Sequence, residues 1–441
     1  MVQMLLEKFG GDARNQPLEG DSAPASQSTG QSAAAPEKIV CFHVDCRLSD
    51  GVEDIGRMRV GKLARLLKYC AEAIWCRWRY GVSDFFFIPA PGMRSAIYRD
   101  WIVMIFCRPF FRRRIYYWQA AGLAEWLRTQ AKPWERKITE ILLAKPALSI
   151  VLAEYGKEDP ACLRCARTEV IPNGVPDPCP DYAAKLRPVR EARAASRAAA
   201  LAETPTPAGA PEPARLFYNV LFLSLCIREK GLFDALEAVV LFNRALAAKG
   251  ARLRARLNVA GKFMSDRERA EFDQRALAPE LQWPPPGSNA GPSESLARYC
   301  GFVSGRDKER LFRENDCFCF PTYYLAESFG IVLVEAMAFG MNIITTRWRG
   351  LPELLPQGYP GMVDPQSPRQ IADKLEQFVT APPNSQLRER FLANYTADLC
   401  AERVRSALVS NPPDAPRHNL ERDGVTGSSR AALHHPNSVI R

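Results

Sequence analysis

Two glutamates interrupt the apolar stretch TYYLAESFGIVLVEAMAFG, residues 322–340. Glu327 and Glu335 stand out because an unpaired carboxylate is costly in an apolar interior. These side chains must therefore face water or hold a polar group. The spacing alone is also typical of an amphipathic helix with one exposed glutamate, so their chemistry depends on the surrounding elements.

A strand-to-helix turn is the expected setting of Glu327. We expect a strand over residues 316–324, a loop that carries Glu327, and a helix that begins near Gly330. Gly340 is placed to end that helix in a left-handed conformation. In a parallel α/β sheet, such turns at the carboxyl ends of the strands are where ligands bind.

The chemistry that suits this turn is the recognition of a sugar nucleotide. Backbone N–H groups of Phe329, Gly330 and Ile331 at the helix start favour phosphate oxygens, together with the helix dipole. Glu327 can accept hydrogen bonds from sugar hydroxyls. Glu335, further along the helix, can accept them from a vicinal diol such as a ribose.

The elements that must position these groups alternate between strand and helix in both halves of the chain. This alternation predicts an α/β protein with two doubly wound, Rossmann-like domains that face each other across a cleft. Expected strands cover 38–44, 84–90, 114–120, 148–156, 168–174, 217–225, 257–261, 316–324 and 342–346, and expected helices cover 61–80, 230–250 and 368–379.

Composition shifts mark the expected boundaries of these domains. Segments rich in Ser, Ala, Gly and Pro are predicted to be disordered or to act as linkers. We expect a disordered segment at 1–36, an N-terminal domain at 37–182, a low-complexity linker or insertion at 183–214 that starts as a basic helix, a second domain at 215–385, a helix at 386–410 and a disordered tail at 411–441.

The net charge of +10 favours an anionic partner. Because lysine and arginine are spread along the chain, we expect a phosphorylated small molecule or a membrane surface and no nucleic acid. The 13 cysteines include no second C-x-x-C at zinc spacing, so we expect no metal site and a reducing, cytoplasmic location. No apolar run approaches the roughly 20 residues that span a bilayer, and the N-terminus lacks a signal-peptide pattern.

Several segments in order resemble the family 4 glycosyltransferases (glycosyltransferases group 1), which are retaining enzymes with the GT-B fold. ESFGIVLVEAMAFG resembles the donor-site signature of that family. The other segments are IREKGLFDALEAV, LNVAGKF, GFVSGRDKERLFRENDCFCFPTYY, NIITTRWRGLPELL and GMVDPQSPRQIADKL, with VIPNGVPDP in the N-terminal half. The resemblance covers about 217–400 strongly and 38–180 weakly.

The resemblance implies that a hexose is transferred from a nucleoside diphosphate sugar, UDP- or GDP-linked, without a metal or other cofactor. Glu327 matches the glutamate that contacts the donor sugar, and Glu335 matches the one that holds the ribose. Lys230 matches the lysine that neutralises the diphosphate. The donor site also includes Ser328 and the turn from Phe329 to Ile331.

Two positions depart from the family pattern. The family often has an arginine five residues before the lysine, where this chain has Leu225, so one cation is missing unless Arg228 or another group replaces it. The family also often has a histidine at the end of an N-domain strand, near the reacting sugar, where this chain has Tyr117 and Gln119 as candidate acceptor-side residues. Gly56 is the candidate for a phosphate-facing turn in the N-terminal domain, although a glycine there also suits an ordinary loop.

Two segments that are rich in aromatic and basic residues, at 69–80 and 98–118, are the evidence for the class of acceptor. Such segments suit peripheral contact with an anionic membrane, at its inner face, and a lipid-linked acceptor. They equally suit an internal helix and strand with arginines that reach the surface, or aromatic rings that stack on a soluble glycan. The implied role is polysaccharide or glycolipid biosynthesis.

Two other functions stay open at the sequence level. Fold does not fix function, so a sugar-nucleotide epimerase or a phosphorylase could share this architecture. A catalytically silent binding module is the other alternative, and Leu225 is its main support.

Overall fold

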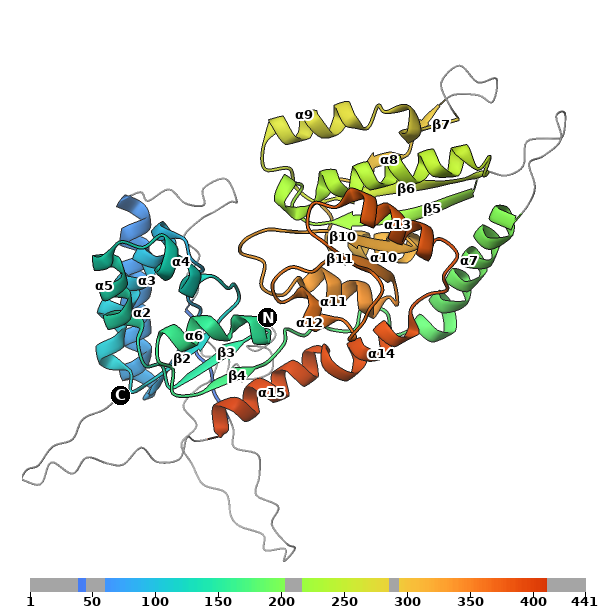
Figure 1. The fold of residues 1–441 in the computed structure, drawn as a ribbon. Helices are drawn as coiled ribbons and strands as arrows, with labels where there is room; N and C mark the ends of the chain where they lie inside the picture. The colour runs from blue at the N-terminus through green and yellow to red at the C-terminus, as the bar shows by residue number, and fades with distance from the viewer. Residues whose placement is uncertain (1–38, 45–59, 203–215, 285–292, 411–441) are drawn as a thin grey trace, which may run out of the picture.

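A computed structural model describes residues 39–44, 60–202, 216–284 and 293–410 (Figure 1). Two parallel sheets form the centres of two α/β domains, which lie side by side and are joined by the last helix. The expected pair of domains is therefore present. The segments 1–36, 203–214 and 411–441, expected to be disordered or a linker, lie outside the described residues, as does Gly56.

The N-terminal domain contains a four-stranded parallel sheet in the order β1-β2-β3-β4. Its strands are β1 (Asp84–Phe87), β2 (Arg113–Tyr117), β3 (Leu148–Val151) and β4 (Thr168–Val170). Its helices are α2 (Val60–Tyr80), α3 (Arg94–Cys107), α4 (Leu123–Thr129), α5 (Pro133–Leu143) and α6 (Glu158–Cys162), with short 3-10 turns η2 (Arg108–Phe110) and η3 (Glu154–Lys157).

The second domain contains a six-stranded parallel sheet in the order β12-β11-β10-β5-β6-β9. Its strands are β5 (Leu216–Leu223), β6 (Leu253–Ala260), β9 (Ala297–Tyr299), β10 (Cys317–Phe320), β11 (Asn342–Thr346) and β12 (Met362–Val363), beside a small antiparallel pair, β7 (Gln282–Trp283) and β8 (Glu294–Ser295). Its helices are α8 (Leu232–Ala248), α9 (Asp266–Arg275), α10 (Gly305–Glu314), α11 (Ile331–Ala338), α12 (Leu351–Leu354) and α13 (Pro368–Phe378), with η5 (Arg228–Lys230) and η6 (Pro279–Leu281).

Several strand predictions differ from the structure, among them the strand expected at 148–156, which ends at Val151 and is followed by η3. Residues 39–44 of the strand expected at 38–44 show only a single bridge residue, at Cys41, and Phe42 instead stacks on Tyr80 at the end of α2 with 4.2 Å between ring centroids. The strand expected to reach residue 324 ends at Phe320, because Pro321 has no N–H to donate to a neighbouring strand.

The segment expected to be a linker from residue 183 is part of the second domain up to Ala202. It forms a π-helical turn, η4 (Tyr182–Leu186), followed by α7 (Arg187–Ala202). The Arg190 guanidinium is buried and donates to the carbonyl of Asn315 at 3.0 Å and to those of Phe312 and Phe339. These hydrogen bonds compensate the buried guanidinium for the loss of water. A solvated linker would not bury this charge, so α7 is packed against the second domain.

The last helical stretch consists of two helices, where a single helix was expected. α14 (Ser385–Asn394) packs against α11, and α15 (Ala397–Val409) returns to the N-terminal domain. Thr396 caps α15, and the Ala397 N–H donates to the Val175 carbonyl at 2.9 Å. Figure 1 shows α15 running below β4 of the N-terminal sheet, so the chain crosses between the domains here. None of the helices in the described residues is both long and apolar enough to cross a bilayer.

Candidate donor site

The turn before α11 is built around Gly330. This residue has φ 67° and ψ 63°, a left-handed conformation that favours glycine, and an added Cβ would lie 2.9 Å from Leu351. Gly340 ends the helix at φ 60°, as the sequence predicted. The Gly330 N–H, expected to be available for phosphate, donates instead to a Glu327 carboxylate oxygen at 3.1 Å. The glutamate therefore occupies the helix N-terminus itself.

Lys230 lies beside Glu327, although the two residues are far apart in the sequence. Its Nζ is 2.6 Å from a Glu327 carboxylate oxygen, and the two side chains are only 12% and 10% exposed. The Nζ also lies 4.6 Å from the centre of the Tyr324 ring. Because a shielded charge is costly without a partner, each of these groups stabilises the other in the absence of ligand.

A close backbone approach holds Lys230 at this position. Gly231 follows it at φ 81°, and an added Cβ would lie 2.2 Å from the Pro321 carbonyl oxygen at the end of β10. The Tyr323 N–H also donates to the Glu229 carbonyl at 2.8 Å. The loops after β5 and β10 are therefore tied together, and this brings Lys230 and Glu327 to one sheet edge.

Glu335 has a lysine partner that the sequence did not reveal. The Nζ of Lys308, on α10, is 2.5 Å from a Glu335 carboxylate oxygen. The side chains are 31% and 15% exposed, so this pair is more open to solvent than the pair of Lys230 and Glu327. No short-range pattern could have identified Lys308, because it lies on a different helix.

The other predicted donor-site residues differ in accessibility. Phe329 is buried and packs edge-on against Tyr395. Ile331, the first residue of α11, is 37% exposed. The Ser328 hydroxyl donates to the main-chain carbonyl of Gln119 at 2.8 Å, which links the donor-site turn to the N-terminal domain.

A neutral hydrogen-bond chain faces this turn from the N-terminal domain. The Tyr117 hydroxyl donates to the side-chain Oδ1 of Asn173 at 2.9 Å, and the side-chain Nδ2 of Asn173 donates to the side-chain Oε1 of Gln119 at 3.0 Å. Among the described residues, the buried Nε2 of Gln119 has no hydrogen-bond partner. The chain of hydrogen bonds thus ends in a buried N–H donor of Gln119, the residue whose main-chain carbonyl contacts Ser328. Asn173 follows β4 as a polar residue, which is the sequence signal that could have identified it.

The fully buried position of Tyr117 corrects its expected role. Burial raises the pKa of its hydroxyl and keeps it protonated as a donor. Tyr117 cannot touch an acceptor directly in this arrangement, and it orients Asn173 instead. Of the two predicted acceptor-side residues, only Gln119 reaches the domain interface.

The missing cation at Leu225 is not replaced by Arg228 in this structure. Leu225 is 38% exposed. The Arg228 guanidinium turns to Glu271 on α9, with both carboxylate oxygens within 2.7 Å. Lys230 and Lys308 are the lysines that the structure pairs with the two donor-site glutamates.

Arg349 joins the two domains near the same turn. It has φ 49°, a strained conformation for a residue with a side chain, and its guanidinium is 2.9 Å from Glu125 and 2.5 Å from the Tyr155 hydroxyl. Glu353 accepts the N–H groups of Glu154 and Tyr155 at 2.6 and 2.9 Å. These contacts clasp the loop after β11 to the turn η3.

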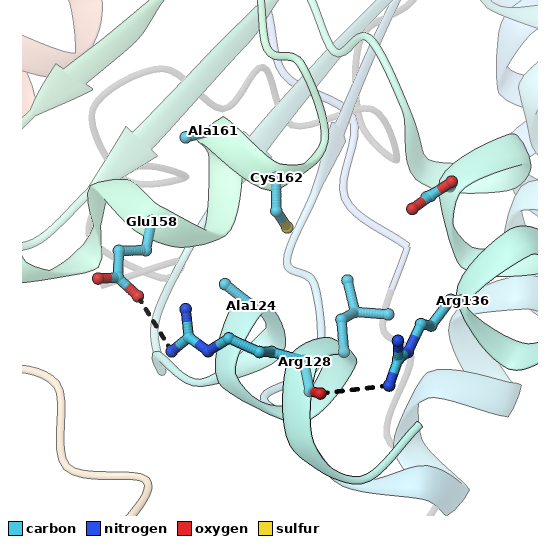
Figure 2. A pocket seen from close by; sticks show the side chains of 8 residues that line it. Ala124, Arg128, Arg136, Glu158, Ala161 and Cys162 are labelled. Carbon is cyan, nitrogen blue, oxygen red and sulfur yellow. Dashed lines mark hydrogen bonds and ion pairs between the residues drawn. The ribbon is translucent and has the colours of Figure 1, made fainter. Parts of the chain in front are cut away.

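A cavity of about 420 Å³ lies elsewhere, among α4, α5 and α6 (Figure 2). Arg128 pairs with Glu158 at 3.9 Å across it, and Arg136 donates to the Arg128 carbonyl. None of the predicted site residues lines this cavity. A second space, of about 10 Å³, lies beside Ser328 and is otherwise lined by residues of the N-terminal domain.

Comparisons with known proteins concern the second domain and the overall fold. Residues 217–397 match the family model "Glycosyl transferases group 1". The phosphatidyl-myo-inositol mannosyltransferase of Mycobacterium tuberculosis is 34% identical over 106 residues, 24% of this chain and 28% of that protein. The D-inositol 3-phosphate glycosyltransferase of Corynebacterium diphtheriae is 33% identical over 122 residues, 26% of this chain and 28% of that protein. The chain thus spans little more than a quarter of the length of these relatives.

Solved structures extend the likeness over both domains. Sucrose-phosphate synthase from Thermosynechococcus elongatus superposes with a TM-score of 0.54 at 16% identity, over 80% of each chain. Anabaena Alr3699/HepE in complex with UDP-glucose gives 0.53 at 16% identity, over 80% of this chain and 84% of that one. The second domain of this chain therefore matches the group 1 glycosyltransferases, and the two domains together have the GT-B fold.

Proposed function

We propose that this protein is a retaining, family 4 glycosyltransferase that moves a hexose from a nucleoside diphosphate sugar to a hydroxyl of a glycan or a lipid-linked acceptor. The observation that carries the proposal is the contact of Lys230 and the Gly330 N–H with the Glu327 carboxylate at the start of α11. A cation, a helix N-terminus and a hydrogen-bond acceptor for sugar hydroxyls meet at one point.

Donor binding would exchange the partners of this cluster. The diphosphate would take the place of the Glu327 carboxylate on Lys230 and on the helix N-terminus, where both favour negative charge. Glu327 would then accept hydrogen bonds from the donor sugar. Glu335 would accept the ribose hydroxyls in exchange for Lys308.

In the proposed reaction, the bond between the anomeric carbon and the phosphate oxygen breaks, and its electron pair stays on the phosphate. The acceptor hydroxyl oxygen bonds to the same face of the anomeric carbon, and its proton passes to the departing phosphate. Lys230 stabilises the negative charge that develops there. Among the residues that the structure describes, the buried Gln119 Nε2 has no hydrogen-bond partner, which supports a role in orienting a sugar or acceptor oxygen.

The donor and the setting belong to the same proposal. The Anabaena protein with the same fold was solved with UDP-glucose, which supports a UDP-sugar as the first donor to test, with a GDP-sugar second. Because Lys230 and the helix N-terminus supply the positive charge, we propose a metal-independent transfer whose rate EDTA leaves unchanged. We place the protein in the cytoplasm, at the inner face of a membrane, in polysaccharide or glycolipid assembly.

A thermal-shift screen with UDP-, GDP-, ADP- and dTDP-sugars tests the donor site. At about 100 times its dissociation constant, the true donor should add about 2.7 kcal/mol of stability. The Glu335→Ala variant should lose that gain, whereas Glu376→Ala, a surface glutamate on α13 paired with Lys249, should keep it. If no sugar nucleotide stabilises the folded protein, the catalytically silent module becomes the better account. Production of an epimerised donor without an acceptor would identify an epimerase instead.

A further inference from the structure

Two helices of the second domain, α10 and α11, contact each other at two successive levels. At the first level, Lys308 of α10 pairs with Glu335 of α11. One helical turn further along each helix, the rings of Phe312 and Phe339 stack, with 5.0 Å between their centroids and an interplanar angle of 10°. Because residues four apart lie on the same face of a helix, both levels belong to one seam, which we call the α10–α11 seam.

Arg190 of α7 binds both helices at the second level of this seam. Its guanidinium donates to the main-chain carbonyls of Phe312 and Phe339, the residues whose rings stack, and to that of Asn315 at 3.0 Å. These carbonyls lie at the C-terminal ends of α10 and α11, where the helix dipoles favour a positive charge. Burial lowers the pKa of Arg190 to about 10, so the guanidinium stays charged at neutral pH. One cation therefore joins the ends of both helices.

We propose that Arg190 is a positioning residue for the donor site, which sets the separation of Lys308 and Glu335 by fixing α10 against α11. The inference rests on the proposed function, in which Glu335 exchanges Lys308 for the ribose hydroxyls. Arg190 is only 3% exposed and donates to main-chain carbonyls, so it acts on the donor through the two helices and not by contact. Without it, two negative helix ends face each other in the interior and repel.

Titration calorimetry with UDP and GDP, run below the melting temperature of each variant, tests the inference. Arg190→Met removes the cation, so the two helix ends should separate and Glu335 should shift from its place. The affinity for the nucleoside diphosphate that the wild type binds should fall by about five-fold or more. Arg190→Lys keeps the charge but lacks the planar fork of donors, so it should fold more readily and show a smaller loss of the same kind.

Arg197→Met is the matched control for the loss of stability. Arg197 lies on the same helix and is also 3% exposed. It donates to the Val379 carbonyl at the end of α13 and pairs with Asp316 at 3.1 Å, and α13 carries none of the predicted donor-site residues. Its removal should lower the melting temperature and leave the affinity for the nucleoside diphosphate unchanged. A loss of stability alone therefore does not produce the result expected for Arg190.

A double variant shows whether Arg190 acts through Glu335. In the Glu335→Ala background, Arg190→Met should cause no further loss of affinity, because the group that it positions is gone. The inference is overturned if the two losses multiply, if Arg190→Met lowers the melting temperature alone, or if Arg197→Met lowers the affinity equally. These outcomes leave the proposed function intact, whereas a wild type that binds neither UDP nor GDP overturns both.

Discussion

The two domains present different chemistry at the facing edges of their parallel sheets. The second domain carries charge, in the pairs Lys230–Glu327 and Lys308–Glu335. The N-terminal domain offers a neutral chain that ends in the Gln119 amide. A diphosphate requires cations, and an incoming hydroxyl requires only hydrogen bonds and a position. The difference therefore indicates which domain would hold the donor and which would orient the acceptor.

The largest effect is expected from removing the charge on the donor side. Lys230→Ala should lower kcat by about 10² to 10³-fold, because one stabilising group for the leaving phosphate is lost. The rate of transfer, measured with the donor from the thermal-shift screen, tests the expected loss of kcat. The melting temperature of the variant shows whether the loss comes from misfolding. Arg228→Ala is the neighbouring control, since Arg228 is occupied by Glu271. An equal loss in Arg228→Ala would show that this arginine replaces the cation missing at Leu225.

The two glutamates should separate binding of the sugar from binding of the nucleotide. Glu335→Gln should lower the affinity for the free nucleoside diphosphate by about ten-fold or more, because a charge-assisted hydrogen bond is lost. Glu327→Gln should leave that affinity unchanged or raise it, because the diphosphate no longer has to displace a carboxylate from Lys230, and it should reduce transfer, because the proposed partner of Glu327 is the donor sugar. Titration calorimetry and rate measurements on both variants give the comparison. Loss of nucleotide binding in Glu327→Gln alone would reverse the assignment.

The clasp between the domains should have a smaller effect. Glu125 is 45% exposed, so its ion pair with Arg349 is worth about 1 kcal/mol or less. Arg349→Ala should therefore change the donor KM by no more than about five-fold. Arg347→Ala is the control, because Arg347 pairs with Asp364 within the second domain. A loss of kcat that matches Lys230→Ala would place Arg349 in the chemistry and contradict the clasp.

The sequence predicted those features that depend on neighbouring residues. The apolar run 342–346 coincides with β11, and Gly340 ends α11 because glycine alone adopts its conformation easily. The pairing of Glu335 with Lys308 and the docking of α7 through Arg190 depend on residues brought together by the fold. No local pattern encodes such contacts. The same reason explains Tyr117, whose position at the end of a strand suggested contact with an acceptor although the packed domain buries it.

The smallest effect on catalysis is expected inside the neutral chain. Tyr117→Phe removes the donor to the Asn173 carbonyl oxygen and leaves that atom without its bond in a buried site. The free energy of unfolding should fall by about 1–3 kcal/mol, while the affinity for the nucleoside diphosphate should stay unchanged. The KM for the acceptor should rise, because Asn173 no longer fixes Gln119. Gln119→Glu keeps the shape of the side chain but replaces its N–H donor with a carboxylate oxygen, so it should raise the acceptor KM, and the buried charge should lower the stability as well. If both variants instead lower the affinity for the nucleoside diphosphate, the chain of Tyr117, Asn173 and Gln119 contributes to donor binding. The proposed division of donor and acceptor between the two domains is then wrong.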